Sequence, residues 1–161
     1  DFLEVITAPV MRRNGTLDRY TGDGLIAFWG APLPMADHAA CALEAAREMF
    51  SRLEDFNRQR LAAGLSPLAM RVGLESGEAV VGDLGSSSRG VYTAVGTCIN
   101  LASRLQEMAR DLGEPLVVGP QAYHACVAGP MPLRSLGLHR VRGLDEPVEL
   151  HGWNRAPAEH A

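Results

Sequence analysis

Residues 20–30, Tyr-Thr-Gly-Asp-Gly-Leu-Ile-Ala-Phe-Trp-Gly, constrain the fold of this 161-residue chain more than any other stretch. A strand-like run, Thr16–Thr21, precedes the Gly-Asp-Gly triplet, and an apolar strand-like run, Leu25–Trp29, follows it. Glycine accepts the positive φ that a tight turn demands, so the pattern predicts a β-hairpin. The hairpin places the carboxylate of Asp23 at the end of a sheet.

A carboxylate on such a turn has two interpretations. It suits a hard cation such as Mg²⁺, which takes one or two protein carboxylates and completes its shell with phosphate oxygens. Alternatively, Asp23 is only a good turn-forming residue.

Composition limits the function classes. With 47% hydrophobic and 21% charged residues the chain can bury the core of one domain, and its net charge of −4 argues against a nucleic-acid partner. The three cysteines, Cys41, Cys98 and Cys126, show no CxxC spacing, which predicts reduced thiols in a cytosolic setting and no zinc site. No apolar run has the length of a membrane span, and no signal peptide opens the chain.

Hydrophobic periodicity predicts four helices. Pro9 is expected to kink or shorten the first, Asp37 to cap the second, and Thr97 to cap the third before Gly113 ends it. The expected helical ranges are 2–13, 39–64, 98–112 and 120–126.

Alternating or short apolar runs predict the remaining strands. Ser76-Gly77 is expected to turn one strand back on the next, and residues 143–147 to join a closing hairpin. The expected ranges are 68–75, 78–84, 92–95, 116–118, 133–141 and 148–153. This mixture predicts an α/β sandwich in which helices pack on one mostly antiparallel sheet.

Asn100 and Arg104 lie four residues apart on one face of the third helix, just after a glycine turn. Arginine carries a planar fork suited to phosphate oxygens, and asparagine both donates and accepts, which suits a sugar oxygen. Alternatively, Arg104 only forms an i,i+3 ion pair with Glu107.

Four blocks, in this order, resemble the class III nucleotide cyclase catalytic domain, in its bacterial adenylate cyclase form. Residues 15–32 resemble the metal-aspartate hairpin of that family, and residues 71–85 its central hairpin. Residues 92–105 end in its Asn-x-x-x-Arg pair, and residues 141–150 resemble its closing strands. The resemblance implies a ferredoxin-like α/β sandwich over residues 1–154, followed by a frayed tail over residues 155–161.

The resemblance also implies roles for individual residues. Asp23 matches the second of two aspartates that bind Mg²⁺ or Mn²⁺, two ions per site. Asn100 matches the residue that orients the ribose, and Arg104 the one that neutralises the α-phosphate in the transition state. Purine-reading and phosphate positions fall on Arg19, Thr93 and Arg142. The implied reaction is attack of the ribose 3′-oxygen of ATP on the α-phosphate, in a homodimer whose sites take the aspartates from one chain and the other groups from its partner.

The family's first metal aspartate lies on an opening strand upstream of the first helix. We therefore expect this chain to be part of a longer cytoplasmic or membrane-anchored protein with an upstream sensor domain, and to be inactive alone. Arg19 stands where adenylate cyclases usually carry lysine, Val91 and Thr97 where bacterial relatives often carry aspartate, and Leu144 where they often carry lysine.

Three other interpretations compete with the enzyme. The substitutions at Arg19, Thr97 and Leu144 favour a degenerate cyclase homology domain that dimerises or binds nucleotide without turnover. The presence of Asp23, Asn100 and Arg104 opposes it. A diguanylate cyclase is disfavoured because its Gly-Gly-Asp/Glu-Glu-Phe signature is absent from the sequence. A scaffold protein that shares the fold by coincidence is the last alternative.

Overall fold

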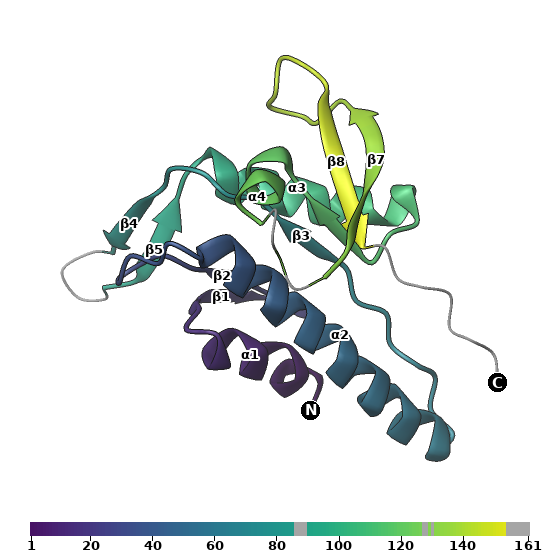
Figure 1. Ribbon diagram of the computed structural model, residues 1–161. Helices are drawn as coiled ribbons and strands as arrows, with labels where there is room; N and C mark the ends of the chain where they lie inside the picture. The colour runs from purple at the N-terminus through teal and green to yellow at the C-terminus, as the bar shows by residue number, and fades with distance from the viewer. Residues whose placement is uncertain (86–89, 127–128, 130, 154–161) are drawn as a thin grey trace.

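The computed structural model describes residues 1–85, 90–126, 129 and 131–153 (Figure 1). This part of the chain contains four helices and eight strands. The helices are α1 (Phe2–Arg12), α2 (His38–Ala62), α3 (Thr97–Leu112) and α4 (Pro120–Ala125). The strands are β1 (Thr16–Thr21), β2 (Gly24–Phe28), β3 (Val72–Leu74), β4 (Val80–Asp83), β5 (Tyr92–Val95), β6 (Leu116–Val118), β7 (Leu133–His139) and β8 (Val148–Trp153). The expected tail over residues 155–161 lies outside the described residues.

The strands form three separate sheets. One has four strands in the order β3-β6-β8-β7, and β1-β2 and β4-β5 are two-stranded. Every pairing is antiparallel except β3 with β6, so the predicted α/β class and mostly antiparallel pairing are confirmed.

The expectation of one sheet, with a hairpin around Ser76-Gly77, was wrong. β3 pairs with β6 inside the four-stranded sheet, whereas β4 pairs with β5 and projects away from it (Figure 1). The expected strand over residues 68–75 is shorter, Val72–Leu74, and the apolar pattern of a strand does not reveal which strand lies alongside it.

The four-stranded sheet is packed on both faces, and β6 lies at its centre. All three residues of β6 are fully buried, as expected of a strand covered on both sides. Leu116 and Val118 pack with α2 and α4, whereas Val117 packs with α3 and β8. Successive side chains of a strand point to opposite faces, so β6 joins the two cores of the predicted sandwich.

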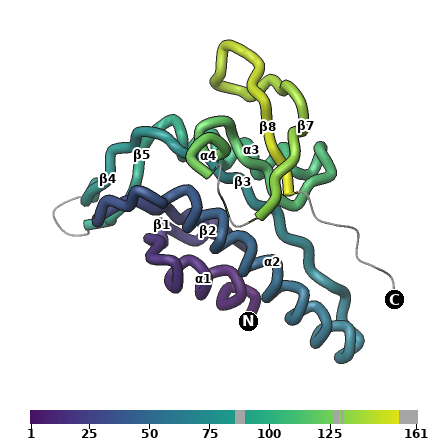
Figure 2. The backbone as a smooth tube through the Cα atoms, viewed as in Figure 1, coloured from purple at the N-terminus to yellow at the C-terminus, as the bar shows by residue number. Residues whose placement is uncertain are grey.

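The β1–β2 hairpin packs against α1 in a third cluster, beside α2 (Figure 2). Val10 of α1 is fully buried there, and the Trp29 indole Nε1 donates to the Arg13 carbonyl at 2.9 Å. α1 is not shortened at Pro9 but extends from Phe2 to Arg12. Pro9 is itself fully buried, so packing offsets the backbone hydrogen bond that proline cannot make.

Helix ends account for two further differences. Asp37 occupies the N-cap position of α2, but its side chain makes no capping hydrogen bond and instead accepts from Cys41 Sγ at 3.5 Å. Thr97 is the first residue of α3 and Gly96 is its N-cap. Gly113 ends α3 in the left-handed region at φ +67°, as predicted. Within the ranges described, none of the helices is both long and apolar enough to cross a lipid bilayer.

Candidate functional site

The orientation of α3 is set by its apolar face, which lies opposite the face that carries Asn100 and Arg104. Leu101, Leu105 and Ala109 recur at helical spacing and are buried against the four-stranded sheet. Asn100 is consequently exposed, and Arg104, one turn further on, is half-buried. The predicted pair therefore lies on one accessible helix face.

Arg104 is held by the turn between β7 and β8. Its Nη1 donates a hydrogen bond to the carbonyl of Arg142. Gly143 follows with φ +97°, and a Cβ at that position would overlap the Arg104 guanidinium. The turn thus needs glycine both for its backbone conformation and for the close approach of Arg104.

This contact brings together two residues that the sequence named for phosphate, Arg104 and Arg142. The contact uses the backbone carbonyl of Arg142, and Arg142 itself is exposed. Among the residues described, no ion pair joins Arg104 to Glu107, so that alternative was wrong. Sequence reasoning assigned Gly143 to a turn and did not connect it with Arg104.

The β1–β2 hairpin confirms the predicted turn. Thr21 pairs with Gly24, Gly22 has φ +60°, and the Asp23 carboxylate is exposed at the tip. Within the described residues no group of three or more His, Cys, Asp or Glu side chains could hold a metal ion. An exposed single carboxylate fits one ligand of an Mg²⁺ ion whose other ligands are phosphate oxygens and waters.

Asp18 is a residue that sequence reasoning missed. Its side chain is only 2% exposed, although its neighbour Arg19 is 57% exposed. Asp18 Oδ2 accepts from Arg19 Nη1 at 2.6 Å, and Asp18 Oδ1 accepts from the Thr93 hydroxyl and, at 3.3 Å, from the Ala94 amide. Arg19 and Thr93, on different sheets, are therefore joined through one buried carboxylate.

The predicted site residues thus fall into groups within one chain. Arg19 and Thr93 meet at Asp18, and Arg104 meets Arg142 at the β7–β8 turn. Figure 1 shows that turn at the top of the view, beyond the ends of β7 and β8, whereas the β1–β2 hairpin lies lower, beside α1 and α2.

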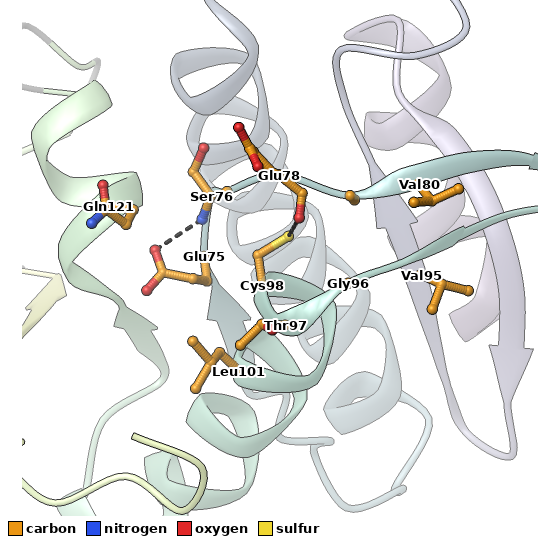
Figure 3. A pocket seen from close by; sticks show the side chains of 12 residues that line it. Glu75, Ser76, Glu78, Val80, Val95, Gly96, Thr97, Cys98, Leu101 and Gln121 are labelled. Carbon is orange, nitrogen blue, oxygen red and sulfur yellow. Dashed lines mark hydrogen bonds between the residues drawn. The ribbon is translucent and has the colours of Figure 1, made fainter. Parts of the chain in front are cut away.

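A hollow of about 840 Å³ opens at the N-terminus of α3, between the end of β3 and the β4–β5 ribbon (Figure 3). None of the six predicted site residues lines it. Glu75 lies at its wall, where its Oε1 accepts from the backbone amides of Ser76 at 2.8 Å and Ala122 at 2.9 Å. Burial raises the pKa of the Glu75 carboxyl, and these backbone hydrogen bonds oppose the shift. Glu75 therefore connects the end of β3 to the start of α4.

The three cysteines are free, as predicted. Cys98 Sγ donates to the Glu78 carbonyl at 3.6 Å across the same hollow (Figure 3). Burial raises the pKa of the thiols of Cys98, Cys126 and Cys41. All three are consequently poor nucleophiles at neutral pH.

Residues 19–142 match the family model described as the adenylate and guanylate cyclase catalytic domain, and the chain belongs to this family of class III nucleotide cyclase domains. The matched range includes Asp23, Thr93 and Asn100, and it also includes both residues of the Arg104–Arg142 contact.

Individual relatives carry names from both branches of the family. Adenylate cyclase 1 of Rhizobium meliloti (strain 1021) is 31% identical over 94% of this chain. The crystal structure of the guanylyl cyclase Cya2 is 27% identical over 99% of this chain and 81% of its own, with a TM-score of 0.79. The adenylyl cyclase CyaB from P. aeruginosa shares the fold, with a TM-score of 0.83 at 23% identity, over 99% of this chain and 82% of its own. The present chain spans 23% of the length of the Rhizobium protein.

Proposed function

We propose that this chain is the catalytic domain of an adenylate cyclase that converts ATP to cyclic AMP and pyrophosphate as part of a homodimer. The observation that carries the proposal is the position of Arg104, whose guanidinium is bonded to the Arg142–Gly143 turn beside the exposed Asn100 on α3.

Arg104 acts on the phosphate in this proposal. One of its nitrogens is occupied by the Arg142 carbonyl, which orients the fork and leaves its other N–H groups free for phosphate oxygens. A cation oriented before the reaction stabilises charge that develops on the α-phosphate without reorganising. Asn100, one turn earlier, bonds the ribose and holds its 3′-oxygen toward the phosphorus.

Asp23 supplies one protein ligand for the metal ions. When bound, Mg²⁺ or Mn²⁺ lowers the pKa of the attacking hydroxyl and neutralises charge on the leaving pyrophosphate. Asp23 is exposed at a hairpin tip, where a second chain can approach. A second carboxylate can come from an added strand, because within the described residues β1 and β2 pair only with each other and β3 is an edge of the four-stranded sheet.

The dimer is supported by an apolar surface on the β4–β5 ribbon. Val80, Leu84, Val91 and Val95 are 53–67% exposed, and Val80 lies opposite Val95 in the pairing. Clustered exposed apolar side chains are typical of interaction surfaces. We propose that a second copy covers this ribbon and that its Asp23 completes the site formed by Asn100 and Arg104 of the first.

The preference for ATP is supported by Thr93 at an expected purine-reading position and by the name of the Rhizobium relative, whereas Arg19 replaces the usual lysine. A second candidate, a regulatory module without turnover, is favoured by Leu144. The resemblance expects a lysine there, but Leu144 packs against the core formed by α3 and β8.

Product analysis distinguishes the two candidates. The full-length protein is incubated with ATP or GTP in Mg²⁺ or Mn²⁺, and cyclic nucleotides are quantified for the wild type and Arg104→Ala. We expect cyclic AMP from the wild type and a kcat lower by about 10²–10³ in the variant, with a smaller change in KM. Absence of product from a protein that still dimerises would favour the regulatory module.

A further inference from the structure

The buried carboxylate of Asp18 has no role in the reaction proposed above, yet it contacts both purine-reading positions. It lies on β1 with 2% of its side chain exposed. Burial of a carboxylate is costly unless hydrogen bonds satisfy it. Here Arg19 Nη1 donates to Oδ2, whereas the Thr93 hydroxyl and the Ala94 amide donate to Oδ1.

These bonds fix the hydrogen-bonding character of Thr93. A threonine hydroxyl has one hydrogen and two lone pairs. Because an ionised carboxylate only accepts, the hydrogen of Thr93 is committed to Asp18, and the hydroxyl can offer only lone pairs to a base. Arg19 is a donor without acceptor capacity, and Asp18 holds one of its nitrogens at 2.6 Å.

Adenine and guanine differ in what they present to such an acceptor. Adenine carries an amino group at position 6, which donates, whereas guanine carries an oxygen there, which only accepts. A Thr93 hydroxyl held as an acceptor satisfies the amino group of adenine, but it cannot donate to the oxygen of guanine, where two acceptors would face each other. An unpaired buried polar group is penalised more than a missing contact.

We infer that Asp18 is a positioning residue for base specificity, which commits Thr93 to accept from the amino group of adenine and orients Arg19 beside it. This inference rests on the proposed function, because it assigns Arg19 and Thr93 to the base. Without Asp18 the Thr93 hydroxyl can rotate and donate to the guanine oxygen, so discrimination against GTP falls.

The test measures equilibrium binding to the full-length protein. ATP and GTP each compete with a fluorescent ATP analogue, and the ratio of the GTP to the ATP dissociation constant is compared among variants. We expect Asp18→Ala to lower this ratio about tenfold, mainly through tighter GTP binding. Asp18→Asn keeps an oxygen that accepts from Thr93 and should retain the ratio within about twofold.

Coupling to Thr93 is tested by a double-mutant cycle. Thr93→Val should lower the ratio by itself, and adding Asp18→Ala to it should change the ratio no further, because Asp18 acts through the hydroxyl. Asp111→Ala, an exposed carboxylate near the end of α3, is the matched control and should leave the ratio unchanged. If Asp18→Ala fails to fold, Thr93→Val and Asp18→Asn still test the inference.

An equal loss of affinity for both nucleotides in Asp18→Ala, or an unchanged ratio in Thr93→Val, would overturn the inference and leave Asp18 as a connection between β1 and β5. Binding does not require turnover. A protein that shows the expected ratios but forms no cyclic product would contradict the proposed function and support this inference, whereas a protein that binds neither nucleotide would overturn both.

Discussion

The four-stranded sheet and the β1–β2 hairpin carry different parts of the proposed site, and they are built differently. The sheet is covered by helices on both faces, and Leu105, Leu116, Val117, Val118 and Leu150 are buried to 2% exposure or less. In the strands of the hairpin Phe28 is the only apolar residue that is buried, beside the buried side chain of Asp18. The sheet therefore defines the position of what it carries far more strictly than the hairpin does.

The difference corresponds to the chemistry assigned to each region. Arg104 must meet one phosphorus atom in one orientation, and it is anchored to α3 and bonded to the β7–β8 turn. Asp23 has only to reach a cation, and it sits at an exposed tip. We take this as the design of a shared site: each chain offers a rigid half that fits the substrate and an exposed half that is completed by its partner.

The largest expected effect comes from damaging the hairpin region in one chain and the sheet region in the other chain of a dimer. Asp23→Ala and Arg104→Ala should each abolish nearly all cyclic nucleotide formation by the full-length protein. An equimolar mixture that has exchanged subunits should recover about a quarter of the wild-type rate, because half of the dimers are mixed and each mixed dimer keeps one intact site. Cyclic nucleotide assays before and after subunit exchange measure it.

Mixtures of Asn100→Ala with Arg104→Ala provide the control, since both changes damage the same half and no recovery is expected. No recovery in the first mixture would show that each chain holds a whole site, whereas recovery in the control mixture would show that Asn100 and Arg104 do not belong to the same half.

Local features of both regions could be predicted from the sequence. The turn at Asp23 follows from two glycines between strand-like runs, and the α3 face of Asn100 and Arg104 follows from the spacing of Leu101 and Leu105. Each depends on residues fewer than about ten positions apart, over which local propensity and periodicity decide the structure.

Contacts between distant segments could not be predicted. Asp18 and Thr93 are separated by 75 positions, and Arg104 and Arg142 by 38. The β3–β6 pairing also depends on register between strands, which alternation alone does not specify. Asp18 in particular looks like an ordinary polar residue of a strand in the sequence, and only the structure shows its burial and its hydrogen bonds to Arg19 and Thr93.

A smaller effect should follow when Gly143 is replaced, because the change disturbs the rigid region without removing a charge. In Gly143→Ala the new Cβ would overlap the Arg104 guanidinium, and the alanine backbone would have to adopt φ +97°. Strain of about 1–3 kcal/mol is expected from the backbone, and displacement of Arg104 should lower kcat by about tenfold to a hundredfold. Steady-state kinetics and urea unfolding measure the two effects.

Gly137→Ala is the matched control for this prediction. Gly137 lies on β7 at φ +83°, and a Cβ there would meet nothing within 4 Å. Gly137→Ala should lower the free energy of unfolding about as much as Gly143→Ala does. It should leave kcat within about twofold of the wild type, because only backbone strain is introduced there. Equal kcat losses in both variants would mean that Arg104 does not depend on the turn.

The smallest expected effect is a pH dependence of stability that originates in the four-stranded sheet. His151 on β8 is 6% exposed, and its ring stacks on Tyr123 with centroids 3.4 Å apart. Its Nδ1 is buried without a hydrogen-bond partner among the described residues. Burial lowers the pKa of His151 below its ordinary 6.5, against an opposing effect of Glu149, while His124 adds to the lowering.

A histidine whose folded-state pKa is lowered favours the neutral form, so its contribution to stability is present above pH 6.5 and is lost as the pH falls through the folded-state pKa. We therefore expect urea unfolding midpoints to decrease between pH 7.5 and pH 5.5, and His151→Phe, which preserves an aromatic ring for stacking, to weaken that decrease. His124→Gln, at an exposed position, should retain most of it. Amide exchange on β6 and β8, relative to β1 and β2, locates the effect: acid should open the sheet more than the hairpin if His151 is responsible, and equal opening of both would exclude it as the source.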